Sequence, residues 1–582
     1  TCTPPAWMAE KYPEILFVYP DGRTATHGGR RHTCPNSPVY RELCTRIVTK
    51  MAEEFGQDDR IIGWQIDNEV FPHNGEISCC CPACSCKFQD YLRERYGTIE
   101  TLNKAWCNNL WSMTYQSFSQ IPIPRAEMWH HPSLLAVWQE FNSKSYVDFV
   151  KHQSDILHQN TKHVIGTDMM VIHGVDHYAM NHNLDVVQFN NYHLGDKLWE
   201  SCFWFDYIRS INKNRPFWNT ETTTSWCGSV ATTGYSEPGF CRANSWLPIA
   251  LGGEANLYWN WRTHWAGQEL TTGAVVTSCG RPMHIFDEVK EISSGYRASE
   301  EFLRGTSLKP AKLALHFSNS TYLSFKVQPI VQNFDYFRAF KDRIYKPIIN
   351  AQYRVDIINP EVNLDDYDMV FTPFFVNLDE AGLKERIKPW IEAGGIWIAG
   401  PLTDCRTADG TKFRSAPFES LEELAGVYCK YQISGENRDF NIKWSNGSDS
   451  NGTLWFDMFE TKGAEVLAEY TDGPGKGLAA ITRYKIGKGY VVLLGTLPTP
   501  DDMMCLFKSM ASDAGLAPAV EASANLVYVP RFGEAGEGAV VVEFDNKPGT
   551  LILEKNAIDL LTGRSLTGKI DIEPYSVMVL KY

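Results

Sequence analysis

Ile61-Ile62-Gly63-Trp64-Gln65-Ile66-Asp67-Asn68-Glu69 begins as an apolar, β-type run and ends in an amide beside a carboxylate. This order is typical of a buried parallel strand whose polar residues lie at its carboxyl end. In a (β/α)₈ barrel, that end carries the catalytic groups. A glutamate there, with Asn68 beside it, suits proton transfer to a glycosidic oxygen. A buried strand that ends in a solvated carboxylate would have the same pattern.

A second stretch has the same character: Pro216-Phe217-Trp218-Asn219-Thr220-Glu221-Thr222-Thr223 is an apolar and β-branched run that closes on a glutamate. Retaining glycosidases place two carboxyl groups roughly 5–5.5 Å apart, one as general acid and one as nucleophile. A barrel brings the ends of different strands together, so sequence separation does not prevent the two glutamates from meeting. Glu69 and Glu221 are therefore our candidate catalytic pair.

Helical and extended segments alternate through residues 1–305, which predicts a TIM (β/α)₈ barrel. Ser37 and Pro38 carry the start signals of a helix over residues 39–55, and a long helix is expected over residues 133–159. The five complete strands end near Glu69 or cover residues 164–168, 184–192, 217–221 and 255–261. A barrel needs eight strands, and Thr1 lies at the end of another. We therefore expect that the chain lacks the first two strands and most of a third.

The pattern changes after about residue 305. Apolar strands and a helix at residues 380–393 predict a smaller, doubly wound, flavodoxin-like α/β domain over residues 306–517. Gly394-Gly395 precedes a strand instead of following one, so a helix-to-strand turn explains it better than a phosphate loop. Short alternating strands from about residue 520 predict a small antiparallel, β-sandwich-like domain over residues 518–582.

The composition argues against several kinds of partner. The 582-residue chain has a formal net charge of −14 and no cluster of basic residues, so neither nucleic acid nor an anionic membrane surface is expected. No uninterrupted apolar run approaches the roughly 18–20 residues of a membrane helix. The 18 tryptophans supply flat rings that can stack on sugars, although ordinary core packing accounts for most of them.

Five of the 16 cysteines crowd into eight residues: Cys79, Cys80, Cys81, Cys84 and Cys86. This density indicates a thiolate metal site more than a disulfide framework. It also favours a reducing compartment, so we expect a cytoplasmic protein, with export left open because the native amino terminus is not visible.

Cys79, Cys81 and Cys84 offer three thiolates for tetrahedral zinc. The fourth ligand is Cys80, Cys86 or a distant cysteine, and we favour Cys34 because its loop lies on the same face of the barrel as the Glu69 loop. A site closed by four protein ligands would be structural and would not activate water.

The chain resembles the β-galactosidases of glycoside hydrolase family 42. The matching landmarks run in family order across about 270 residues: Pro5-Ala6-Trp7, Arg30-Arg31-His32, Cys34-Pro35-Asn36-Ser37-Pro38, Trp64 to Glu69, Cys79-x-Cys81-Pro82-x-Cys84, Tyr96 to Trp106, Trp111-Ser112, Pro216-Phe217 leading to Glu221, Trp261-Arg262, and Gly267-x-Glu269.

The resemblance implies roles for these residues. Glu69 would be the general acid/base, Glu221 the nucleophile, and Asn68 a partner of the sugar 2-hydroxyl. Cys34, Cys79, Cys81 and Cys84 would hold zinc. Trp111 and Glu269 would line the galactose subsite, with Trp226 as the candidate for the family's tryptophan after the nucleophile. The middle domain would mediate a homotrimer, the assembly usual in the family.

Some positions depart from the family pattern. Thr272 stands where the family usually has histidine, and Asp168 where it often has asparagine. Asn190-Asn191-Tyr192 replaces a strand end that contains aspartate. These positions surround the expected sugar pocket, so they affect sugar preference more than reaction type.

The sequence therefore predicts a retaining exo-β-galactosidase (EC 3.2.1.23) that releases terminal β-D-galactose through a covalent galactosyl-enzyme intermediate. One alternative is a related glycosidase that prefers α-L-arabinopyranosides or galacto-oligosaccharides. Another is a non-catalytic sugar-binding or assembly protein, against which the presence of both glutamates argues.

Overall fold

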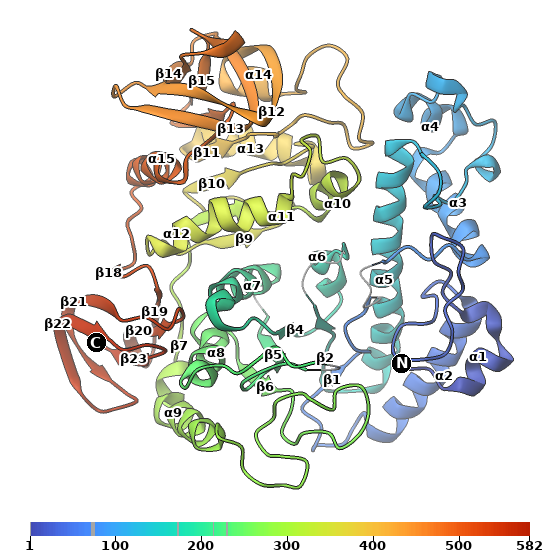
Figure 1. Cartoon of the computed structure of the whole chain (residues 1–582), viewed down its shortest axis with the longest axis vertical. Helices are drawn as coiled ribbons and strands as arrows, with labels where there is room; N and C mark the ends of the chain where they lie inside the picture. The colour runs from blue at the N-terminus through green and yellow to red at the C-terminus, as the bar shows by residue number, and fades with distance from the viewer. Residues whose placement is uncertain (1, 72–75, 171–173, 214, 229–230) are drawn as a thin grey trace.

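The computed structural model describes residues 2–71, 76–170, 174–213, 215–228 and 231–582 (Figure 1). The chain passes from a helix-rich first part, through a middle part built on a large sheet, to a compact set of strands at the carboxyl end. Figure 1 shows the last of these, in red, beside the barrel helices α8 and α9. α8 spans Phe240–Ala250 and α9 spans Phe286–Arg304.

The barrel strands are short, parallel and arranged in chain order. β1 (Gly63–Gln65) pairs with β2 (Val164–Gly166), and Thr167 alone separates β2 from β3 (Asp168–Met169). β3, β4 (Val187–Asn191), β5 (Phe217–Thr222) and β6 (Ala255–Tyr258) then form one parallel sheet. Because all these strands run the same way, the polar residues at their carboxyl ends share one face, as predicted.

The helices of this part cover the strands. α2 (Pro38–Phe55) begins as predicted: the Ser37 hydroxyl accepts a hydrogen bond from the Tyr40 amide, and Pro38 occupies the first helical position. α5 (Pro132–Asn160) is the predicted long helix. The others are α1 (Ala6–Lys11), α3 (Pro82–Tyr96), α4 (Ile99–Trp106), α6 (His177–Asn181) and α7 (Leu198–Ile211).

α3 begins with Pro82 at its first helical position, so Cys84 lies in its first turn. The following strand boundary differs from the sequence expectation. The last barrel strand ends at Tyr258 and not at Trp261, and a cis peptide joins Trp259 to Asn260.

The middle part contains a sheet of ten strands in the order β17-β13-β12-β14-β15-β16-β11-β10-β8-β9. Its parallel half confirms the predicted doubly wound arrangement: β8 (Leu313–His316), β9 (Asp356–Ile358), β10 (Met369–Thr372), β11 (Ile396–Ala399) and β16 (Gly489–Leu494). The antiparallel half was not predicted: β12 (Val427–Trp444), β13 (Asp449–Thr461), β14 (Glu465–Tyr470), β15 (Ala479–Ile486) and β17 (Leu497–Pro498).

Helices lie along this sheet (Figure 1). They are α10 (Asn319–Val327), α11 (Tyr336–Ala339), α12 (Lys346–Asn350), α13 (Leu383–Ala393), α14 (Leu421–Ala425) and α15 (Pro500–Asp513). The predicted helix at residues 380–393 is thus a 3₁₀ turn at Glu380–Gly382 followed by α13.

The third sheet is antiparallel, as predicted. It runs in the order β18-β21-β23-β20-β19-β7, with β22 paired to β21. Its strands are β7 (Thr306–Leu308), β18 (Glu521–Ala522), β19 (Leu526–Gly533), β20 (Gly536–Glu543), β21 (Gly549–Asp559), β22 (Ser565–Ile572) and β23 (Val577–Lys581). β7 precedes the middle sheet in sequence, and yet it pairs with β19, which follows that sheet. The chain therefore enters and leaves the middle part beside the third sheet.

A buried ionic network joins the barrel to the middle sheet. Asp206, on α7, is fully buried, and its carboxylate accepts hydrogen bonds from the Tyr345 hydroxyl at 2.7 Å and from Arg354 at 2.7 Å. Arg209, one turn further along α7, pairs with Asp356 of β9 at 2.8 Å. Charges this deep are stable only when paired, so the network fixes α7 against the middle sheet.

We expect Asp206→Ala to lower the free energy of unfolding by about 3–5 kcal/mol, because it leaves buried guanidinium groups without their carboxylate. Chemical denaturation measures the change. The matched control is Asp287→Ala, which removes the exposed partner of Lys290 and should cost less than about 1 kcal/mol. A similar small cost for Asp206→Ala would contradict the structural role of the network.

Candidate active site

Glu69 lies just beyond the carboxyl end of β1, in a cluster of polar groups. It is 5% exposed, and its backbone has a φ of 43°, which is uncommon for a residue with a side chain. Its amide donates to the Asp168 carboxylate at 2.9 Å. The Asn190 side-chain amide donates to both carboxylates, at 3.2 Å to Glu69 and 3.0 Å to Asp168. The ends of β1, β3 and β4 therefore position this glutamate together.

Glu221 lies in β5, on the same face. The Tyr192 hydroxyl, just after β4, donates to its Oε2 at 2.7 Å. Burial raises the pKa of the Glu221 carboxyl to about 7, and the negative charge of Glu69 adds to the rise, while the Tyr192 hydrogen bond opposes it. The structure thus brings the two predicted glutamates into electrostatic contact.

Arg30 lies between two carboxylates, Glu69 and Glu269. Its guanidinium lies 3.6 Å from Glu69 Oε2 and 3.6 Å from Glu269 Oε1. The Trp259 indole donates to the other Glu269 oxygen at 2.7 Å. Glu269, expected to line the sugar subsite, is therefore placed beside the pair. The sequence analysis treated Arg30 as a landmark only. The sequence could have indicated this role, because Arg30 lies four residues before Cys34, in a loop expected on this face of the barrel.

The remaining residues expected to bind sugar differ in their placement. Asn68 has a buried side-chain amide nitrogen with no hydrogen-bond partner within the described residues, so it can donate to a ligand. Trp226 donates to the Thr271 carbonyl at 2.9 Å, and its ring lies parallel to that of His284. Thr272, at the position of the family histidine, is 6% exposed and donates to the Gly228 carbonyl.

Trp111 lies apart from this group. It is 73% exposed and packs against the ring of Trp129, which is 82% exposed. No hydrogen bond or ring contact joins it to the two glutamates in the part of the chain that the structure describes. A role for Trp111 in the galactose subsite stays a prediction.

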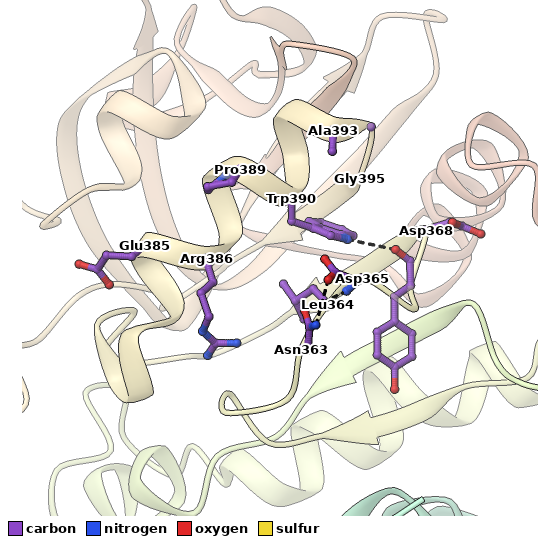
Figure 2. A pocket seen from close by; sticks show the side chains of 12 residues that line it. Asn363, Leu364, Asp365, Asp368, Glu385, Arg386, Pro389, Trp390, Ala393 and Gly395 are labelled. Carbon is purple, nitrogen blue, oxygen red and sulfur yellow. Dashed lines mark hydrogen bonds between the residues drawn. The ribbon is translucent and has the colours of Figure 1, made fainter.

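Another hollow lies in the middle part and has a volume of about 600 Å³. Its lining includes Asp368, just before β10, and Gly395, just before β11, both labelled in Figure 2. Its polar groups already have partners: the Trp390 indole donates to the Tyr367 carbonyl, and Arg386 donates to the carbonyls of Val362 and Ala381. None of the residues that surround Glu69 lines this hollow.

Four buried cysteines form a separate cluster on the same side of the barrel. The sulfurs of Cys34, Cys79, Cys81 and Cys84 all lie within 4.8 Å of one another. Cys34 Sγ is 3.3 Å from Cys84 Sγ and 3.5 Å from Cys81 Sγ, too far for a disulfide of about 2.05 Å. Sulfurs bound at about 2.3 Å to one tetrahedral ion would be about 3.8 Å apart. The cluster can therefore hold a metal ion.

Hydrogen-bond donors surround these sulfurs. The Asn36 amide donates to Cys34 Sγ at 3.3 Å, the Asn36 side chain to Cys84 Sγ at 3.4 Å, and the Val18 amide to Cys79 Sγ at 3.5 Å. Such donors stabilise thiolates and orient metal ligands. Of the two nearer alternatives for the fourth position, the buried Cys80 sulfur faces the Pro124 carbonyl, and Cys86 is exposed.

The cysteine cluster and the carboxylates share one loop. Arg31, three residues before Cys34, forms a buried ion pair with Asp67 at 2.8 Å and donates to the Asn68 carbonyl. A metal ion at Cys34 would hold this loop, and the loop holds the end of β1. The cluster can thus fix the position of Glu69 without touching a substrate.

Comparison with known proteins gave consistent matches. A β-galactosidase family model, that of glycosyl hydrolase family 42, matches residues 1–298, and a β-galactosidase trimerisation domain matches residues 311–517. The chain is 33% identical to β-galactosidase YesZ of Bacillus licheniformis and 31% identical to that of Bacillus subtilis, covering all of this chain and 88% of each relative.

A solved β-galactosidase from Bacillus circulans sp. alkalophilus superposes with a TM-score of 0.93 at 24% identity, over 99% of this chain and 87% of that one. Among the described residues, no helix combines the length and apolar character needed to cross a bilayer.

We expect the purified protein to carry one divalent metal ion per chain, and Cys81→Ser to lose it, because the remaining sulfurs cannot close a tetrahedral site. Elemental analysis measures the ion, and thermal unfolding should show a lower midpoint for the variant. The control is Cys86→Ser, whose exposed thiol lies outside the cluster. Equal metal content in both variants would contradict the assignment.

Proposed function

The chain belongs to the family 42 β-galactosidases, and on that premise we propose that Glu69 and Glu221 hydrolyse its substrates as acid/base and nucleophile. The family, the barrel fold and the enzyme class predicted from the sequence are confirmed. Enzymes of this family act on β-galactosides with retention of configuration. The roles of individual residues are our proposal, carried chiefly by the position of Glu69 just after β1 and of Glu221 in β5, close enough for the charge of Glu69 to raise the pKa of Glu221.

In the first step, Glu221 Oε2 or Oε1 attacks the anomeric carbon while Glu69 gives its proton to the departing oxygen. The bond from the anomeric carbon to that oxygen breaks, and a galactosyl ester of Glu221 forms. Glu69, now ionised, takes a proton from water, whose oxygen attacks the same carbon and releases Glu221. Galactose leaves with its original configuration, and both carboxyls return to their starting state.

The groups around the pair suit these roles. Tyr192 donates to Glu221 and stabilises its negative charge before attack and on release. Asn190 and Arg30 hold Glu69 near the site of the glycosidic oxygen. The free Asn68 amide is placed to donate to a sugar hydroxyl, and Glu269 and Trp226 to bound the sugar on the β6 side. We propose these as the substrate-binding residues, with Trp111 as an additional one.

We propose that the ion bound by Cys34, Cys79, Cys81 and Cys84 is structural zinc. Four thiolates in a tetrahedral arrangement suit zinc, and no position is left open for water. Its role would be to hold the loop of Arg30 and Arg31. All 16 cysteines are free thiols, which fits the reducing cytoplasm that we propose as the compartment.

We also propose a homotrimer formed through the middle part, residues 306–517, with residues 1–305 as the catalytic domain and 518–582 as the third domain. The match of residues 311–517 to a trimerisation domain supports this.

We expect Glu221→Ala to lose hydrolysis of para-nitrophenyl β-D-galactopyranoside by at least about 10⁴-fold, because no nucleophile remains. Azide should restore turnover and yield α-galactosyl azide, since it attacks from the face that Glu221 vacates. The matched variant Glu69→Ala should yield β-galactosyl azide through the intact intermediate. Product configuration is read by nuclear magnetic resonance, and exchanged configurations would reverse the two roles.

We expect kcat/KM to rise as pH rises through about 7, because Glu221 must lose its proton before it can attack the anomeric carbon. Tyr192→Phe removes the hydrogen bond that lowers this pKa, so this acid limb should move to higher pH while kcat falls roughly 10²-fold.

The control for this shift is Tyr431→Phe, which alters an exposed tyrosine of the middle sheet. Full pH profiles of kcat/KM separate a changed titration from a general loss of folding. A limb that stays in place or moves to lower pH in Tyr192→Phe would contradict the coupling between Tyr192 and Glu221.

A further inference from the structure

A second cavity adjoins the catalytic carboxylates. It has a volume of about 350 Å³ and is lined by parts of the segment from Tyr19 to His32. Arg30 belongs to both places, because it lines this cavity and also lies 3.6 Å from Glu69 Oε2. Only the Arg30 side chain therefore needs to be passed between Glu69, the proposed acid/base, and this cavity.

The lining is rich in hydrogen-bond donors and contains no carboxylate. Its side chains include three arginines and two threonines, Thr24 and Thr26. Arg31 already forms an ion pair with Asp67. Arg30 already lies between Glu69 and Glu269. Arg23 differs: its side chain is 80% exposed, pairs with Asp21 in the same turn and lies over the Tyr19 ring. Its guanidinium can turn toward an incoming anion at little cost, because an exposed ion pair contributes little.

A buried histidine completes the cavity. His32 is 5% exposed, lines the cavity, and has neither ring nitrogen in a hydrogen bond of normal geometry with the described residues. Buried polar groups without partners are rare in folded proteins. An imidazole left in this state, facing a donor-lined hollow, indicates a place where a ligand supplies the missing partner.

Arg30 links the cavity to the bound substrate through its contacts with Glu69 and Glu269. The acid/base protonates the glycosidic oxygen, so the departing sugar lies on the Glu69 side of the cleaved bond. We propose that this cavity binds an anionic group, a carboxylate or a sulfate, on the departing sugar, with Arg23 and His32 as its recognition residues. This inference rests on the proposed function and names the substrate class: β-galactosides of acidic sugars.

The test compares three disaccharides that differ only at carbon 6 of the departing sugar. They are β-D-galactosyl-(1→4)-D-glucose, its 6-sulfate, and β-D-galactosyl-(1→4)-D-glucuronic acid. We expect kcat/KM for at least one charged substrate to exceed that for the neutral one by about tenfold, the value of one good charge-assisted hydrogen bond. The ratio should fall as salt rises, because the cavity is open to solvent.

Arg23→Gln should bring this ratio close to one. Arg60→Gln is the matched control: Arg60 is 88% exposed and pairs with Asp58 two residues away, as Arg23 does with Asp21, but lies outside the cavity. The control should keep both the ratio and the activity. The charged substrate that shows the preference distinguishes a carboxylate site from a sulfate site.

Two outcomes would overturn the inference. One is equal kcat/KM for neutral and charged disaccharides while para-nitrophenyl β-D-galactopyranoside is hydrolysed, which leaves the proposed function intact. The other is a preference that survives in Arg23→Gln, which would place the recognition elsewhere. Failure to cleave any galactoside, the aryl glycoside included, would instead refute the proposed function.

Discussion

The buried ion pair between Arg31 and Asp67 is the contact on which the active site depends. Both side chains are nearly inaccessible, and their charged atoms lie 2.8 Å apart. Removing one partner would leave the other charge buried and unpaired, which is far more costly than never burying it. The pair joins the loop of the cysteine cluster to the end of β1, where Asn68 and Glu69 follow. One interaction thus links the cysteine cluster, the end of β1 and Glu69, the proposed acid/base.

The surroundings of Glu69 also hold several carboxylates, whose negative charges must be compensated. Glu69, Glu221 and Glu269 lie close together, and their mutual repulsion favours protonation of at least one. Arg30 offsets this repulsion between Glu69 and Glu269, Tyr192 stabilises Glu221, and the Trp259 indole binds Glu269. A retaining glycosidase needs one carboxyl charged as nucleophile and one protonated as acid, and the Tyr192 hydrogen bond favours the charged form of Glu221.

The remaining parts of the chain hold this region in place from outside. The network of Asp206, Arg209 and Arg354 fixes α7 against the middle sheet, and α7 lies between β4 and β5, whose ends carry Tyr192 and Glu221. β7 returns the chain to the third sheet before the middle part begins. The strands β4 and β5, which position Tyr192 and Glu221, are therefore supported by both later parts of the chain.

The sequence by itself determined those features that depend on local order. Ser37 and Pro38 start α2 because a cap and a proline act on the adjacent turn. The glutamates close apolar runs, and parallel strands place all such ends on one face. Close cysteine spacing indicated a metal cluster, and the shared face suggested Cys34.

Tertiary structure decided what depends on partners distant in sequence. The pairing of β12 with β13, and of β7 with β19, depends on strands whose polar, irregular sequences do not encode their neighbours. Arg30 could bridge Glu69 and Glu269 only after the loops that carry these three residues had come together. A side chain's residue type fixes its chemistry, but its electrostatic environment arises only when the chain folds.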